Sequence, residues 1–175
     1  MDIGKSVKNI FDLVHRFGNE EDQISANFGF IMKINPPVLS DVLRKLQIDT
    51  KVLRKQDFKR IEIETQVPYK IDGEPCYIDL ILKLDDKFLV FFESKIWGNK
   101  LTEKQTKKYA KLLIAQKGYF GLVRFVYISQ FDQREEFRRL RKIAGLKGDE
   151  FCHFRWEDIR NMVEKYNTKG RLKFI

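Results

Sequence analysis

The sequence predicts a mixed α/β domain in which helices cover a central mixed sheet, and three observations lead to that prediction. Residues 61–70 (IEIETQVPYK) alternate apolar and polar side chains, which is typical of a half-buried strand. Residues 88–95 (FLVFFESK) and 122–129 (LVRFVYIS) are almost continuously apolar, as strands covered on both faces are. The segments around these strands place apolar residues at helical spacing, so helices are expected to supply the covering layers.

The N-terminal region, residues 1–58, is predicted to be helical. Apolar residues recur at helical spacing from Ile10 to Phe17 and again from Ile24 to Met32. The following Asn-Pro-Pro at 35–37 is expected to end that region, because proline cannot continue a helix. Ser40 then has the chemistry of an N-cap for a short helix that runs to about Leu46.

Residues 59–130 are predicted to form the core that contains the candidate site, and residues 131–175 add a helix, a strand and a helix. Strands at 61–70, 76–84 and 88–95 form a meander joined by turns at IDGEP and DDK. A helix from Leu101 and the strand at 122–129 complete the core. The C-terminal part is a basic amphipathic helix that ends at Gly145, a short strand at 151–156 and a helix at 157–166. No linker or repeat divides the chain, so a single domain of 1–175 is expected.

Composition narrows the class of protein. The 34 Lys and Arg residues exceed the 25 Asp and Glu residues, and a net charge of +9 favours a polyanionic partner such as nucleic acid. The separated Cys76 and Cys152 form no zinc motif and favour a reducing cytoplasm. No apolar run approaches the roughly 18 residues of a membrane span, so neither a membrane partner nor a signal peptide is expected.

The strand at 88–95 ends on an acid and a base that point to the same face. Glu93 and Lys95 are two positions apart, and Asp79 lies inside the preceding apolar strand. Two neighbouring strands joined by a short turn can bring the two carboxylates side by side, where they repel each other unless a cation lies between them. Oxygen ligands of this kind suit Mg²⁺, with Mn²⁺ as a substitute. The alternative to a metal site is that Glu93 and Lys95 form a solvated strand end and that Asp79 pairs with a nearby lysine.

This arrangement of Asp79 and Glu93-Ser94-Lys95 resembles the PD-(D/E)XK nuclease superfamily, although Ile78 replaces the proline of the motif. The resemblance implies a restriction-endonuclease-like αβββαβ core and metal-dependent hydrolysis of DNA to a 5′-phosphate. It implies metal ligands in Asp79, Glu93 and the Ser94 carbonyl, and a catalytic Lys95 that positions water. Gln105 and Tyr109 match the QxxxY pattern of RecB-like members, and an acid on the first helix, Glu21 or alternatively Glu20 or Asp22, is expected to join the metal site.

Basic and aromatic residues after the third strand are candidates for DNA binding. Trp97 could stack on a base, and the lysines after it could contact phosphates; these lysines are Lys100, Lys104, Lys108 and Lys111. A second basic cluster lies at residues 138–142, and part of each cluster is expected to be a solvated helix face. A homodimer is possible. The alternatives to a nuclease are a non-catalytic nucleic-acid-binding module on the same fold and a protein-interaction subunit.

Overall fold

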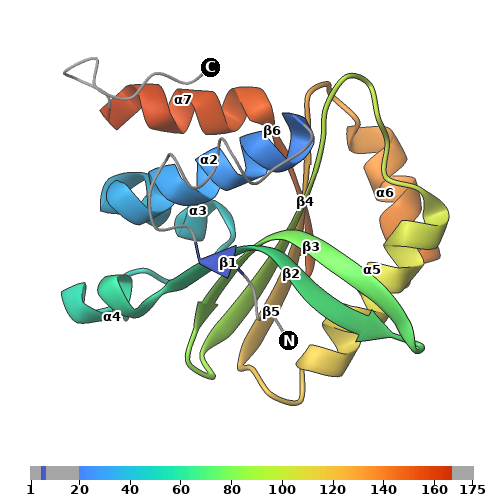
Figure 1. Ribbon diagram of the computed structural model, residues 1–175, viewed down its shortest axis with the longest axis horizontal. Helices are drawn as coiled ribbons and strands as arrows, with labels where there is room; N and C mark the ends of the chain where they lie inside the picture. The colour runs from blue at the N-terminus through green and yellow to red at the C-terminus, as the bar shows by residue number, and fades with distance from the viewer. Residues whose placement is uncertain (1–4, 7–19, 167–175) are drawn as a thin grey trace.

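The structure is a computed structural model that describes residues 5–6 and 20–166. Its elements alternate in the order expected of a mixed α/β protein (Figure 1). The helices are α2 (Glu20–Ile34), α3 (Pro36–Lys45), α4 (Lys55–Arg60), α5 (Glu103–Gln116), α6 (Arg134–Ile143) and α7 (Trp156–Tyr166). The strands are β1 (Lys5–Ser6), β2 (Glu62–Ile71), β3 (Glu74–Leu84), β4 (Phe88–Lys95), β5 (Leu122–Ser129) and β6 (Phe151–Arg155).

The described strands form one mixed sheet in the order β1-β2-β3-β4-β5-β6. The first four strands pair antiparallel, and β4, β5 and β6 pair parallel. Two parallel pairs need two crossovers, and α5 and α6 supply them on the same side of the sheet (Figure 1). Helices α2, α3 and α7 cover the opposite face. The predicted α/β class is therefore confirmed.

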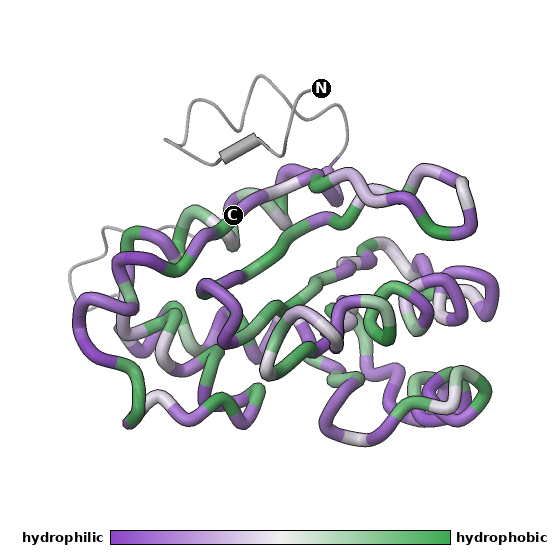
Figure 2. Tube along the Cα trace, turned by 90° about the horizontal axis from the view of Figure 1, so that it is seen from below, coloured by the Kyte–Doolittle hydropathy of each residue, from purple (hydrophilic) through white to green (hydrophobic). Residues whose placement is uncertain are grey.

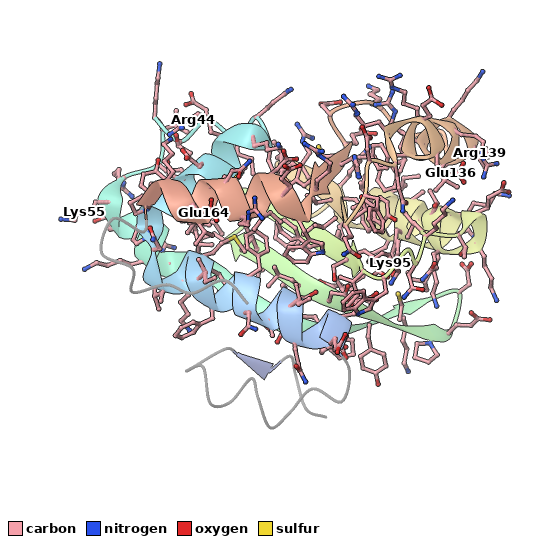
Figure 3. The ribbon with its side chains drawn as sticks, turned by 90° about the horizontal axis from the view of Figure 1, so that it is seen from above. Arg44, Lys55, Lys95, Glu136, Arg139 and Glu164 are labelled. Atoms are coloured by element: carbon pink, nitrogen blue, oxygen red, sulfur yellow. The ribbon has the colours of Figure 1, made fainter. Side chains whose placement is uncertain are left out.

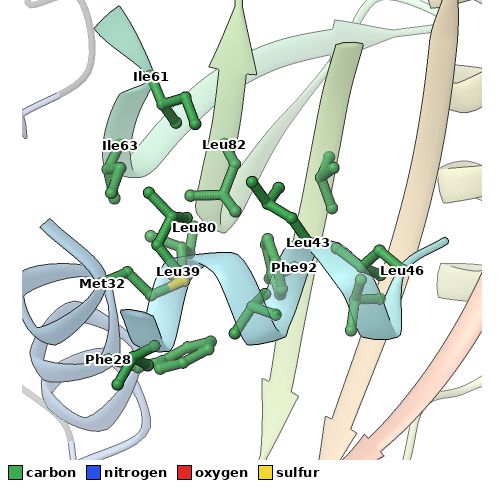
Figure 4. Packing of buried hydrophobic residues seen from close by; sticks show 14 of the residues in the cluster. Phe28, Met32, Leu39, Leu43, Leu46, Ile61, Ile63, Leu80, Leu82 and Phe92 are labelled. Carbon is green, nitrogen blue, oxygen red and sulfur yellow. The ribbon is translucent and has the colours of Figure 1, made fainter. Parts of the chain in front are cut away.

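The alternation of side chains along β4 divides the interior into two cores. Phe88, Val90 and Phe92 pack into the core beneath α2, α3 and α7, whereas Leu89 and Phe91 pack into the core beneath α5 and α6. Figure 4 shows side chains of the first core meeting from the sheet and from α2 and α3. Figure 2 shows hydrophobic colour concentrated along the inner strands and hydrophilic colour along the outer turns. A strand buried on both faces explains why FLVFFESK lacks the alternation of β2.

The hairpin of β2 and β3 bends where its sequence permits. Asp72 and Gly73 form the two-residue turn, both with positive φ (53° and 80°), which matches the type that suits a tight hairpin. Gln66 also has a positive φ of 52°, inside β2. Before Gln66, β2 contributes to the core under α2, and after it Val67 and Ile71 belong to the core under α5. The bend thus carries the end of the hairpin over α5.

The start of α3 differs from the prediction. The residues Asn-Pro-Pro do end α2, but they also start α3: Asn35 is the N-cap, its side chain accepts a hydrogen bond from the Val38 N–H (3.3 Å), and Pro36 opens the helix. Proline suits the first turn of a helix, because its fixed φ is helical and the N–H that it lacks would have no partner within the helix at this position. Ser40 is therefore an interior helix residue, and its prediction as an N-cap is wrong. The predicted helix around Ile10 lies outside the described residues.

The predicted strands at 88–95 and 122–129 are confirmed to the residue, and Gly145 follows α6 with the positive φ (68°) expected at a helix end. Helix α4 was not predicted, because its six residues carry no apolar period. Across residues 20–166, no helix has both the length and the apolar character needed to cross a membrane.

Candidate active site

Asp79 lies where β3 and β4 separate. The antiparallel ladder between these strands ends at the pair Leu80 and Phe92. The next main-chain donor on β4, the Ser94 N–H, is instead bonded to Asp79 Oδ2 at 2.8 Å. The carboxylate thus replaces a main-chain acceptor of the ladder. This contact anchors Asp79 beside the last residues of β4.

Glu93 is held from two sides. Its Oε2 accepts a hydrogen bond from the Tyr109 hydroxyl at 2.6 Å, and its Oε1 lies 2.7 Å from Lys95 Nζ. Tyr109 comes from α5, where its ring stacks on Phe125 with centroids 4.7 Å apart. The position of the hydroxyl is therefore set by packing in the second core. Glu93 and Lys95 share a face of β4, as the sequence predicted.

The start of α2 supplies a third carboxylate. Glu21 Oε1 lies 2.7 Å from Lys95 Nζ, and its Oε2 accepts a hydrogen bond from the Ile96 N–H at 3.4 Å. The neighbouring acids have other partners: Glu20 accepts from the Trp97 indole N–H (2.6 Å), and Asp22 accepts from the Gln66 side-chain amide (2.9 Å). Of the three acids that the sequence left open, Glu21 is the one in contact with Lys95.

Burial dominates the electrostatics of this cluster. Asp79 is 8% exposed and Glu93 4% exposed. Burial, followed by the charge of Glu93, holds the pKa of Asp79 well above its usual value, and burial also raises the pKa of Glu93. Burial lowers the pKa of Lys95, but the opposing effects of Glu93 and Glu21 are together larger, so that pKa is raised. Lys95 is therefore a charged ammonium between two carboxylates.

The donor set has the chemistry of a divalent-cation site. Asp79, Glu93 and Glu21 supply carboxylate oxygens, the ligand type that Mg²⁺ and Mn²⁺ prefer. These three carboxyl groups outnumber the single ammonium of Lys95, and burial is the main reason that the pKa values of Asp79 and Glu93 are raised. Within residues 20–166, no three acidic, histidine or cysteine side chains already have the spacing of a metal cage. Asp79 and Glu93 would be the residues that hold a metal.

We expect Tyr109→Phe to lower the free energy of unfolding by about 1.5–3 kcal/mol, the usual worth of a hydrogen bond to a charged group. The substitution removes the only hydroxyl contact of Glu93 among the described residues, and it should raise the pKa of Glu93 further. Urea unfolding near neutral pH measures the change. Tyr119→Phe, at a side chain that is 73% exposed, is the control and should change stability little. Equal effects of the two substitutions would contradict this role for Tyr109.

The Gln105 side chain is engaged at the start of α5, whereas the Ser94 hydroxyl donates to Asp79 Oδ2 at 3.4 Å. Gln105 is three residues after Thr102, the N-cap of α5, and the two form a capping box: Gln105 Oε1 accepts from the Thr102 N–H at 3.1 Å. The side chain of Ser94 points to the opposite face of β4, where its hydroxyl lies 2.6 Å from that of Ser25. Of the QxxxY pair, the structure therefore brings only Tyr109 into contact with Glu93.

The residues predicted to bind nucleic acid lie in two different settings. Trp97 is 71% exposed and follows the cluster directly, with its main-chain N–H bonded to Gln130. Lys108 donates to the Pro75 carbonyl (2.9 Å) and Lys111 pairs with Asp72, so the hairpin tip already engages both. Lys104 lies in a surface depression that Lys108 and Lys111 also line, whereas Lys100 lies beside the start of α6.

Sequence reasoning missed Ser25 and Gln130, which link α2 and the loop after β5 to the site. Ser25 is four residues after Glu21 and bonds to its main-chain carbonyl, so helical spacing places both near Ser94. Gln130 carried no signal of this kind, because its contact with Trp97 depends on tertiary packing.

Fold and site together define an α/β protein with a buried carboxylate–lysine cluster at the end of its central strands. No family model matches the chain, and no curated protein matches it. Among solved structures, protein VC1899 from Vibrio cholerae is similar, with 17% sequence identity and a TM-score of 0.43 over 86% of this chain and 36% of that one. The chain thus spans about a third of that protein's length, and a likeness at this level leaves the function to be argued from the site.

Proposed function

We propose that this protein is a metal-dependent nuclease that hydrolyses phosphodiester bonds in DNA. The observation that carries the proposal is the meeting of Asp79, Glu93 and Lys95 where β3 and β4 separate, next to Glu21 from α2. The similarity of these residues to the PD-(D/E)XK motif, and the order of strands and helices around them, support a restriction-endonuclease-like core.

In this proposal Asp79 and Glu93 bind Mg²⁺ or Mn²⁺, with the Ser94 carbonyl as a further ligand and Glu21 nearby. When bound, such a metal would supply Lewis acidity at the scissile phosphate and would favour deprotonation of the attacking water. The ammonium of Lys95 orients the attacking water and stabilises negative charge that develops on the phosphate. Tyr109 holds the Glu93 carboxylate in place through its hydroxyl. The product expected from the family resemblance is a 5′-phosphate.

The proposed setting is the cytoplasm. Cys76 and Cys152 are free thiols in the structure, and burial raises the pKa of each, which makes both poor nucleophiles. Two unreactive, unpaired cysteines are compatible with a reducing compartment.

The test is incubation of the full chain with supercoiled, linear and single-stranded DNA in the presence of Mg²⁺, Mn²⁺ or EDTA. Cleavage that requires the metal and is lost in Asp79→Asn supports the nuclease, and the preferred substrate separates internal cutting from end processing. Asp57→Asn is the matched control, because Asp57 is a buried acid on α4 whose partners are Arg54, Arg60 and Lys87 rather than the site. DNA binding without cleavage under all conditions would favour the non-catalytic binding module.

A further inference from the structure

A basic groove follows the outer edge of β6. Among the described strands, β6 pairs only with β5 and leaves its other edge open. A cavity of about 490 Å³ lies along this edge, between α6 on one side and the ends of α3 and α7 on the other. Its charged lining residues are Lys45, Arg134, Arg138, Arg141, Arg155 and Asp158.

The charge of this groove distinguishes it from the other depressions of the surface. Five cationic side chains and one acidic side chain line the groove. Lys45 and Arg155 pair with that acid, Asp158, and Arg134 pairs with Asp132. The depression at the start of α6 has four cations and three acids, and the depression beside α5 has four lysines and two acids. The β6 groove therefore carries the largest excess of positive charge among these three, and its complement is a polyanion.

Helix α6 presents its arginines to the groove in a row. Arg134, Arg138 and Arg141 are spaced four and three residues apart, so they lie along one face of the helix. Arg134 is paired with Asp132. Within residues 20–166, neither Arg138 nor Arg141 makes an ion pair. The Arg141 guanidinium lies against Gly148, only 3.0 Å from the position that a Cβ would occupy there, so a larger residue would displace it. Two unpaired guanidinium groups are thus available to an anionic ligand.

The register of the sheet relates this groove to the candidate active site. Lys95 on β4 pairs with Ser129 on β5, and Ser129 pairs with Arg155 on β6. Adjacent strands are about 4.8 Å apart, so Arg155 lies roughly 10 Å from Lys95 along this row. This separation is short enough for one nucleic-acid strand to reach both the groove and the candidate active site.

We propose that the β6 groove binds the phosphate backbone of the nucleic acid close to the bond at the active site. Arg138 and Arg141 contact phosphates directly, and Lys45 and Arg155 line the path. This placement rests on the proposed function, whereas binding of nucleic acid in the groove does not require cleavage. An acidic peptide added as a strand to the open β6 edge is the competing occupant.

The test measures binding of a fluorescent oligonucleotide to the full chain in EDTA, so that cleavage does not enter. Arg138→Ala/Arg141→Ala is compared with wild type over a range of salt concentrations. The control is Lys55→Ala/Lys59→Ala, which removes the same charge from exposed residues of α4, at the far end of the molecule from α6 (Figure 3). Arg138→Lys/Arg141→Lys keeps the charge, and circular dichroism establishes that each variant is folded.

We expect the double alanine variant to bind at least about tenfold more weakly and to reduce the slope of log K against log salt by about 2, one for each lost phosphate contact. The lysine variant should recover most of the affinity, and the α4 control should match wild type. Unchanged binding in the double alanine variant would overturn the proposal. Binding of polyglutamate as tight as that of the oligonucleotide, with the same loss in the variant, would also overturn it in favour of an acidic peptide. If the double alanine variant loses binding and the wild-type protein does not cleave DNA, the result would support nucleic-acid binding in the groove and refute the proposed nuclease activity.

Discussion

Asp79→Asn should make the protein more stable near neutral pH while abolishing metal-dependent cleavage. Asparagine keeps an oxygen that can accept the hydrogen bond of the Ser94 N–H, so the separation of β3 and β4 should be preserved. It removes a buried charge whose pKa is raised by burial and by Glu93. Cleavage should fall by about 100-fold or more, because a residue proposed to bind the metal is lost.

The sign of the stability change follows from proton linkage. Because the pKa of Asp79 is higher in the folded than in the unfolded state, its ionisation destabilises the fold as pH rises from about 4 towards the folded-state pKa. The neutral asparagine does not incur this cost. We therefore expect a gain on the order of 1 kcal/mol or more near pH 8, since one pKa unit corresponds to about 1.4 kcal/mol, and a smaller gain near pH 4.

Urea unfolding at the two pH values measures this gain, and Asp57→Asn is the control of opposite sign. The hydrogen bond from the Arg54 N–H, followed by nearby cations, lowers the pKa of Asp57, so its ionised form stabilises the fold above the unfolded pKa. Asp57→Asn should lose stability near neutral pH. Magnesium should raise the melting temperature of wild type and of Asp57→Asn but not of Asp79→Asn. A loss of stability in Asp79→Asn at pH 8 would contradict the electrostatic account of the site.

Lys95→Ala should lower the free energy of unfolding by about 3–5 kcal/mol near neutral pH, the cost of leaving one partner of a buried ion pair uncompensated. Lys95 contacts both Glu21 and Glu93 at 2.7 Å, and Glu93 is nearly inaccessible to water. Without the ammonium, the pKa of Glu93 should rise further. The destabilisation should therefore shrink as the pH falls towards about 4, where the carboxyl group is protonated in both states.

Two comparisons make this prediction specific. Lys83→Ala removes a lysine that pairs with Glu62 at 3.3 Å on the partly exposed surface of the sheet, and such pairs contribute at most about 1 kcal/mol. Adding Glu93→Gln to Lys95→Ala should restore much of the lost stability, because the buried charge is then also removed. If Lys95→Ala cost no more than Lys83→Ala, or if Glu93→Gln brought no recovery, the buried-pair account would be wrong.

The sequence alone determined the features that depend on local spacing. Side chains alternate between the two faces of a strand, so Glu93 and Lys95, two positions apart in FLVFFESK, lie on one face. The short turn after β3 brought Asp79 next to them. Helical spacing placed Tyr109 on the side of α5 that faces Glu93. These relations involve residues that are neighbours along one element or across one tight turn, so the geometry of the backbone already contains them.

Only the tertiary structure decided the features that depend on how separate elements pack. The first turn of α2 carries three adjacent acids, and the packing of that helix against β4 brings Glu21 rather than Glu20 or Asp22 to Lys95. Gln105 lies on the same helix as Tyr109, but its side chain accepts a hydrogen bond from the Thr102 N–H instead of reaching the carboxylates. The β6 groove combines residues from α3, α6, β6 and α7, more than 100 positions apart in the chain. Periodicity within one element holds no information about such distant contacts, because they arise from the burial of several apolar faces at once.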